Sequence, residues 1–242
     1  MFGWRAKIGM MIPTNNTVIE PEMAYFSPDG VTFHATRMVS SRTGTASIEG
    51  LHNLVSCVDR ASEELSITGV DSVLYGCLST SFAVEGWDQQ FQEKTAAWMP
   101  TPAITALEAT CLAIKSFGVS EVAVLCPYGE ALQQLAASAF ARHGLKITTL
   151  KSINVTGLRA VCGVPERAVY RAAREMDKCG APLLCILATD LSTATIIRQL
   201  ESDLAMPVVT TNQALCWATL NLAGVHDTVP QGGSLFANRF VR

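Results

Sequence analysis

One cysteine of this 242-residue chain stands where a thiol could react. Cys77 ends a short apolar segment and opens the hydroxyl-rich turn Leu78-Ser79-Thr80-Ser81. A helix N-terminus stabilises a nearby thiolate, so this position predicts a lowered pKa for the thiol. Cys77 is therefore a candidate nucleophile or carbon base. The alternative is a small apolar residue that closes a strand, and position alone does not separate the two.

Two further side chains are candidates for binding a carboxylate. Tyr128 follows Pro127 after another apolar segment, and its phenol could donate a hydrogen bond or its ring could simply line a rim. Asn16 lies in the turn Pro13-Thr14-Asn15-Asn16-Thr17. Its amide could hold a carboxylate or could satisfy its own turn.

Four turns are expected to position these groups, because ligands of open α/β sheets bind beyond the carboxyl ends of the strands. The turns are residues 13–17, 76–82, 127–130 and 188–193. The turns are rich in hydrogen-bond donors and poor in Lys and Arg. Such a lining favours a small carboxylate over a polyphosphate, and no glycine-rich phosphate motif is present. The predicted substrate-binding residues are Thr14, Asn16, Leu78, Ser79, Tyr128, Thr189 and Asp190.

The segments before these turns are short apolar runs, typical of strands buried on both faces of a parallel sheet. The runs are Lys7–Ile12, Ser72–Leu74, Val122–Leu125 and Leu183–Leu187. Helical spacing separates them over Ile48–Leu65, Glu130–His143 and Glu166–Lys178. Thr17-Val18-Ile19-Glu20 fits a helix capping box. The alternation predicts an α/β fold with helices on both faces of each sheet.

The chain also contains an internal repeat. Ile8–Thr14 returns as Val122–Tyr128, and Gly30–His34 returns as Gly144–Thr148, both displaced by 114 positions (122 − 8 and 144 − 30). Residues 101–105 are echoed by 206–210, with Cys111 and Cys216 each six residues beyond.

The repeat predicts two half-domains related by a pseudo-twofold axis, over residues 1–115 and 116–242. A helix over about 210–223 is expected to return to the first half. Each half would be a parallel sheet flanked by helices, with an active-site cleft between the halves. A chain of this length with 49% hydrophobic residues can bury two cores of ordinary size.

Composition narrows the partners and the compartment. The net charge of −3 gives no basic surface for nucleic acid, and the chain shows neither a signal peptide nor an apolar run long enough to span a membrane. We expect a cytoplasmic homo-oligomer acting on a small molecule. No spacing of the eight cysteines fits zinc, and a core-packing role is expected for most of them. Those assigned to packing are Cys57, Cys111, Cys162, Cys179, Cys185 and Cys216.

Taken together, four segments resemble the maleate cis-trans isomerases. Residues 13–22 look like their P-S-S-N-T-x-x-E-P-E segment, and residues 75–82 resemble their Y-x-C-T-S-x-S-F. Pro127-Tyr128 matches their P-Y, and residues 188–193 are similar to their C-T-N-L-R-T. The likeness runs from about residue 7 to 224 and places the chain in the aspartate/glutamate racemase superfamily, beside maleate isomerase and arylmalonate decarboxylase.

The resemblance implies a cofactor-free enzyme in which two thiols face a planar substrate from opposite sides. The first thiol falls on Cys77, but the second falls on Ala188, whose methyl group can neither accept nor donate a proton. The chain is then either a natural one-cysteine branch or carries a Cys→Ala exchange. Arylmalonate decarboxylases also have one cysteine, but theirs is the second. The carboxylate-binding Asn of the isomerases is out of register here, where Asn154 lies nearby.

The resemblance favours an isomerase in which the Cys77 thiolate adds to the alkene of an unsaturated dicarboxylate and leaves after rotation. Ser79, Thr189 and Asp190 would supply donors to the carbanion. A cofactor-free decarboxylase or racemase is the alternative from the same superfamily. From a different class, the chain could be a catalytically silent binder of small carboxylates.

Overall fold

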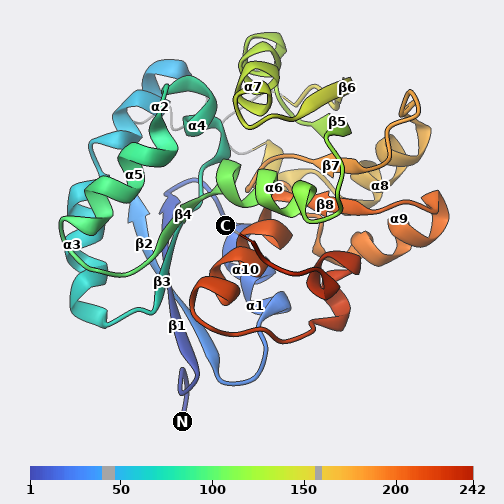
Figure 1. Ribbon diagram of the computed structural model, residues 1–242. Coiled ribbons are helices and arrows are strands. Elements are labelled where there is room, and N and C mark those ends of the chain that lie inside the picture. Colours follow the sequence, from blue (N-terminus) through green and yellow to red (C-terminus); the bar gives the residue numbers. More distant parts are fainter. Residues whose placement is uncertain (40–46, 156–159, 242) are drawn as a thin grey trace.

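The computed structural model describes residues 1–39, 47–155 and 160–241 and contains two four-stranded parallel sheets. The first sheet has the order β2-β1-β3-β4, from β1 (Ala6–Pro13), β2 (Val31–Met38), β3 (Ser72–Tyr75) and β4 (Ala103–Thr105). The second has the order β6-β5-β7-β8, from β5 (Glu121–Cys126), β6 (Lys146–Ser152), β7 (Leu184–Ile186) and β8 (Val208–Thr210). The same order in both sheets confirms the predicted α/β fold with parallel strands (Figure 1).

The repeat is visible in the strand register. Ile8 pairs with Phe33 in the first sheet, and Val122 pairs with Ile147 in the second, so both partners are displaced by 114 positions (122 − 8 and 147 − 33). One residue later a bulge shifts the second sheet, and Ala123 pairs with Thr149. The two sheets therefore share one topology and part of one register.

Ten α-helices and four 3₁₀ helices connect the strands within the described residues. They are α1 (Ile19–Phe26), α2 (Ile48–Val55), α3 (Val58–Thr68), α4 (Leu78–Ala83), α5 (Trp87–Ala96), α6 (Ala106–Lys115), α7 (Glu130–Arg142), α8 (Glu166–Glu175), α9 (Ile197–Leu204), α10 (Thr211–Leu222), η1 (Val161–Gly163), η2 (Ala194–Ile196), η3 (Pro230–Gly232) and η4 (Ser234–Ala237).

The single helix predicted over residues 48–65 is wrong, because the chain breaks between α2 and α3. The Ser56 hydroxyl donates to the Asn53 carbonyl at 2.7 Å, and the Ser56 N–H donates to the same carbonyl at 3.2 Å. These local bonds replace the helical pattern for one turn. Leu54 and Val58 stay buried on either side, so the apolar spacing continues through the break and conceals it.

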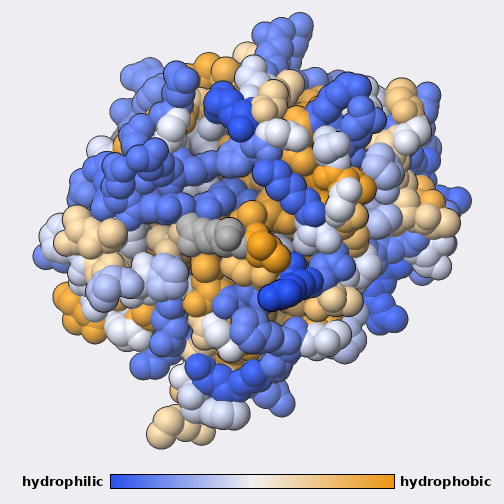
Figure 2. Space-filling model, in the orientation of Figure 1, coloured by the Kyte–Doolittle hydropathy of each residue, from blue (hydrophilic) through white to orange (hydrophobic). Residues whose placement is uncertain are grey.

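Two equivalent helices meet between the sheets. α6 follows β4 and α10 follows β8, and Figure 1 shows them side by side at the middle of the molecule, where they pack together. Every residue of α10 from Thr211 to Leu220 is buried, and α10 also packs on α1, β3 and β4. Figure 2 has the orientation of Figure 1, and hydrophilic residues cover most of the outer part of the molecule in this view. Among the helices that the structure describes, none has the length and hydrophobicity needed to cross a bilayer.

Candidate active site

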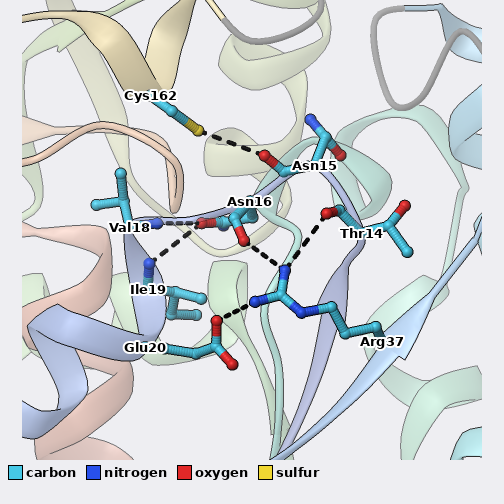
Figure 3. Close-up of polar contacts among 8 residues, drawn as sticks. All are labelled: Thr14, Asn15, Asn16, Val18, Ile19, Glu20, Arg37 and Cys162. Atoms are coloured by element: carbon cyan, nitrogen blue, oxygen red, sulfur yellow. Dashed lines mark hydrogen bonds and ion pairs between the residues drawn. The ribbon is translucent and has the colours of Figure 1, made fainter.

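The turn after β1 is organised by a buried amide. Asn16 is 1% exposed, and its Oδ1 accepts hydrogen bonds from the N–H groups of Val18 at 2.9 Å and Ile19 at 3.1 Å (Figure 3). The predicted capping box at Thr17 is wrong, because the residue that caps α1 is Val18, which makes no side-chain cap bond, and the Asn16 amide binds the N–H groups of Val18 and Ile19 instead. Asn16 Nδ2 donates to Thr189 Oγ1 at 3.1 Å, which leaves one N–H of the amide for another acceptor.

Arg37, which was not among the residues predicted from the sequence, binds the backbone carbonyls of this turn. Arg37, near the end of β2, donates through Nη1 to the carbonyls of Asn16 at 2.7 Å and Thr14 at 3.3 Å. Its Nη2 pairs with the Glu20 carboxylate (Figure 3). The Thr14 side chain itself is exposed, and its predicted role in substrate binding stays a prediction.

Cys77 lies between β3 and α4 and is 3% exposed. Its Sγ lies 3.7 Å from the Ser79 hydroxyl. Burial raises the pKa of the thiol, and this effect outweighs the hydrogen bonds from Thr80 and Ser79 that favour the thiolate. The predicted lowering of the Cys77 pKa is therefore wrong. The desolvation of a buried thiolate exceeds what these hydrogen bonds supply.

Thr189 joins the turns of the two sheets. Its hydroxyl donates to the Gly76 carbonyl at 2.9 Å while it accepts the bond from Asn16. The Thr189 carbonyl accepts from Asn212 Nδ2 at 2.9 Å. Gly76, the residue before Cys77, is thus hydrogen-bonded directly to the turn that follows β7.

Ala188 has a backbone conformation that L-residues rarely adopt. Its φ is +113°, its N–H donates to Thr211 Oγ1 at 3.2 Å, and it is 3% exposed. Its methyl group packs in an apolar cluster with Leu125 and Ile186. Such strain concentrates at functional sites and costs on the order of 1–3 kcal/mol. That Ala188 faces Cys77 stays a prediction.

Tyr128 and Asp190 are two further residues that were predicted to bind the substrate. The Tyr128 ring packs edge-on against Phe82 of α4, with 6.0 Å between ring centroids, and its pKa is raised by burial and then by the Asp190 charge. Burial raises the pKa of Asp190 to about 6. The Asp190 charge also opposes ionisation of Cys77, so the three groups are electrostatically coupled. Leu78 is 1% exposed, and its side chain belongs to the core.

A buried carboxylate that the sequence analysis missed lies beneath these turns. Glu22 of α1 is 4% exposed and accepts hydrogen bonds from the N–H groups of Thr193 at 2.5 Å and Ala194 at 2.7 Å. It also accepts from Asn212 Nδ2 at 2.7 Å, the amide group that binds Thr189. Glu22 stands in the quoted isomerase-like segment, whereas no sequence signal marks Asn212.

The cysteine predictions are partly correct. All eight cysteines are free, and the expected burial is confirmed for Cys111, Cys185 and Cys216. A packing role is wrong for Cys179, which is exposed. Cys57 is partly exposed but packs against a core cluster, as predicted, and the packing role of Cys162, also partly exposed, stays a prediction. Cys162 donates from the second half to the Asn15 carbonyl at 3.6 Å, at the edge of the turn after β1 (Figure 3).

Comparison with known proteins agrees with this fold. A maleate isomerase of Pseudomonas putida is 23% identical, covering 97% of this chain and 98% of that protein. An arylmalonate decarboxylase of Bordetella bronchiseptica is 24% identical, covering 90% of each chain. A structure of a Nocardia farcinica maleate cis-trans isomerase mutant with a covalently bound succinylcysteine intermediate superposes with a TM-score of 0.87, at 21% identity, over 96% of this chain and 98% of that one.

A match to a protein family extends over most of the chain. Residues 8–236 match the arylmalonate decarboxylase family, a range that includes nearly all of both sheets and all four turns. The resemblance seen in the sequence motifs is thereby confirmed. The chain belongs to the arylmalonate decarboxylase family.

Proposed function

We propose that this chain is a cofactor-independent isomerase of a small cis-unsaturated dicarboxylate, with Cys77 as its nucleophile. The observation that carries the proposal is the hydrogen bond from Thr189 to Gly76, which joins the turn of the Cys77 thiol to the turn of Thr189 and Asp190. Relatives that match nearly the whole chain are named maleate isomerase, and one related structure holds a succinylcysteine.

The chemistry follows from the thiol. Addition of the Cys77 sulfur to one alkene carbon converts the double bond into a single bond, about which the two ends rotate. Expulsion of the sulfur then gives the trans product. The Tyr128 hydroxyl makes no hydrogen bond to a described residue, so we assign it to one substrate carboxylate. The N–H groups of Leu78 and Ser79 open α4 without partners inside that helix and can stabilise developing charge.

A cofactor-free decarboxylase is the second candidate. Ala188 removes the second proton-transfer group, and a decarboxylase needs to protonate its enediolate from one face only. The family match carries the name of that reaction. This reading assigns Cys77 to proton delivery rather than to covalent addition.

The test compares maleate and phenylmalonate as substrates of the purified protein, followed by NMR. Maleate should be converted to fumarate, Cys77→Ser should abolish the conversion, and the exposed-thiol control Cys179→Ser should retain it. Mass spectrometry of the quenched enzyme should show one diacid added at Cys77. Loss of CO₂ from phenylmalonate without action on maleate would move the assignment to the decarboxylase, and turnover of neither would refute both.

The substrate class is proposed on the same grounds. A small carboxylate fits a site with hydroxyl and amide donors, and it is the class named for the related enzymes. Homo-oligomeric assembly, a cytoplasmic location and independence from a cofactor stay predictions from the sequence.

A further inference from the structure

The turn that contains the Asp190 carboxylate is hydrogen-bonded to the turn that contains the Cys77 thiol. Asp190 follows Thr189, whose hydroxyl is fixed to the Gly76 carbonyl next to Cys77. The negative charge of Asp190 raises the pKa of the Cys77 thiol and of the Tyr128 phenol, so the carboxylate lies within electrostatic reach of both. Thr189 thereby holds an acidic group and a thiol together from opposite halves of the chain.

The state of the neighbouring groups creates a need for a base. Burial holds Cys77 as a thiol at neutral pH, and a thiol must lose its proton before the sulfur can add to a carbon. Tyr128 also stays protonated, and the Ala188 methyl group carries no exchangeable proton. Among the described residues, the titratable groups whose pKa the Asp190 charge raises are Cys77, before α4, and Tyr128, before α7.

Asp190 has the properties of a group that both takes and returns a proton. It is partly exposed, and its hydrogen bond comes from its own backbone N–H. Burial raises the pKa of its carboxyl to about 6, close to the pH at which a cytoplasmic enzyme works. General acid–base catalysis is most effective when the pKa of the group lies near the working pH.

We propose that Asp190 is the acid/base residue of this site, which accepts the thiol proton of Cys77 and delivers it to the substrate carbon next to the one that sulfur attacks. The inference rests on the proposed isomerase function. It gives the chain a carboxylate in the role for which Ala188 is unsuited.

The step balances without another reactant. The S–H bond breaks and its proton moves to Asp190, the S–C bond forms, and the π electron pair of the alkene moves to the adjacent carbon. Asp190 returns the proton to that carbon and gives a succinyl thioether. After rotation about the new single bond, Asp190 removes the other hydrogen of that carbon, and the electron pair of the broken C–H bond becomes the new π bond. The electron pair of the C–S bond leaves with the sulfur. The sulfur then regains a proton from Asp190.

Asp190→Asn is the decisive variant, because an amide keeps the shape but cannot carry the proton. We expect kcat for maleate to fall by about 10²–10⁴-fold. In the wild type, kcat/KM should decline as the pH falls through about 6, since protonated Asp190 cannot accept the thiol proton. Asp190→Glu should recover part of the activity. Fumarate formed in D₂O by the wild type should carry one deuterium, and fumarate without deuterium would overturn the proposed step.

A second measurement does not require turnover. Loss of the Asp190 charge lowers the pKa of Cys77, so Asp190→Asn should speed the alkylation of Cys77 by iodoacetamide at neutral pH. An active wild type whose Asp190→Asn variant keeps full kcat overturns the role of Asp190 and leaves the isomerase intact. A wild type inactive on every diacid instead overturns the isomerase, whatever the alkylation rates. Cys162→Ser serves as the control, and an equal loss of kcat there would transfer the role to that thiol.

Discussion

The Thr189 hydroxyl joins the two turns on which the site depends, and its removal should be costly. Thr189→Val keeps the shape of the side chain and deletes the oxygen that accepts from Asn16 at 3.1 Å and donates to Gly76 at 2.9 Å. Both partners are buried, and an orphaned buried polar group costs about 1–3 kcal/mol. We expect the free energy of unfolding to fall by about 2–4 kcal/mol.

Urea and thermal unfolding followed by circular dichroism measure this loss. For a chain of this size, 1 kcal/mol corresponds to about 2–4 °C in Tm, so the expected shift is roughly 4–16 °C. Thr189→Ser retains the hydroxyl and loses a methyl group, at about 0.8 kcal/mol. The matched control is Thr219→Val. Thr219 is also fully buried, but its hydroxyl donates at 2.7 Å to Leu215, a carbonyl of its own helix that keeps its helical partner.

Two results would contradict this reasoning. If Thr189→Val is no less stable than Thr219→Val, the link between the turns contributes little. If Thr189→Ser is as unstable as Thr189→Val, the methyl packing of Thr189 and not its hydroxyl holds the turn. Under the proposed function, Thr189→Val should also lower kcat/KM more than Thr189→Ser, since Gly76 precedes Cys77.

Three further predictions concern single side chains. Tyr128→Phe should lower kcat/KM by about tenfold to a hundredfold through the loss of one charge-assisted hydrogen bond, with Tm unchanged. An unaltered kcat/KM would place that carboxylate elsewhere. Glu22→Ala leaves three buried donors without an acceptor, one of them on Asn212. The free energy of unfolding measured in urea should fall by about 3–5 kcal/mol. A fall below about 1 kcal/mol would show that water replaces the carboxylate. Peptide mapping after iodoacetamide treatment at pH 8 should find the exposed Cys179 modified and Cys126 intact, because burial raises the pKa of Cys126 to about 11. Rapid labelling of Cys126 would mean that its strand opens.

The sequence predicts the strands well because their signals are local. A run of apolar residues buried on both faces has few alternatives to a parallel strand, and the 114-residue repeat carries the register from Ile8 and Phe33 to Val122 and Ile147. The break after α2 is hidden because the hydrophobic spacing passes through it unchanged. The start of α1 after Val18 rather than after Thr17 depends on backbone angles that a motif does not specify.

The site is predicted less completely, because its energetics depend on partners far away in the chain. A helix start next to Cys77 is visible in the sequence, whereas the burial that raises the pKa of the thiol comes from a core cluster whose members, such as Met11 and Phe91, are brought together only by folding. Glu22 and Asn212 are separated by 190 positions, so neither residue signals the other. Asp190 is among the predicted substrate-binding residues, but nothing in the sequence shows that its charge raises the pKa of Cys77.

The pairing of α6 with α10 bears on the ancestry of such a chain. Each half contributes one of these helices, and the apolar surface of each is covered by its counterpart in the other half. A single half released into water would expose that surface, and a second copy of the same half would cover it. Two sheets of the same strand order, each followed by one of two helices that pack together, are the arrangement expected of a homodimer whose subunits became joined end to end.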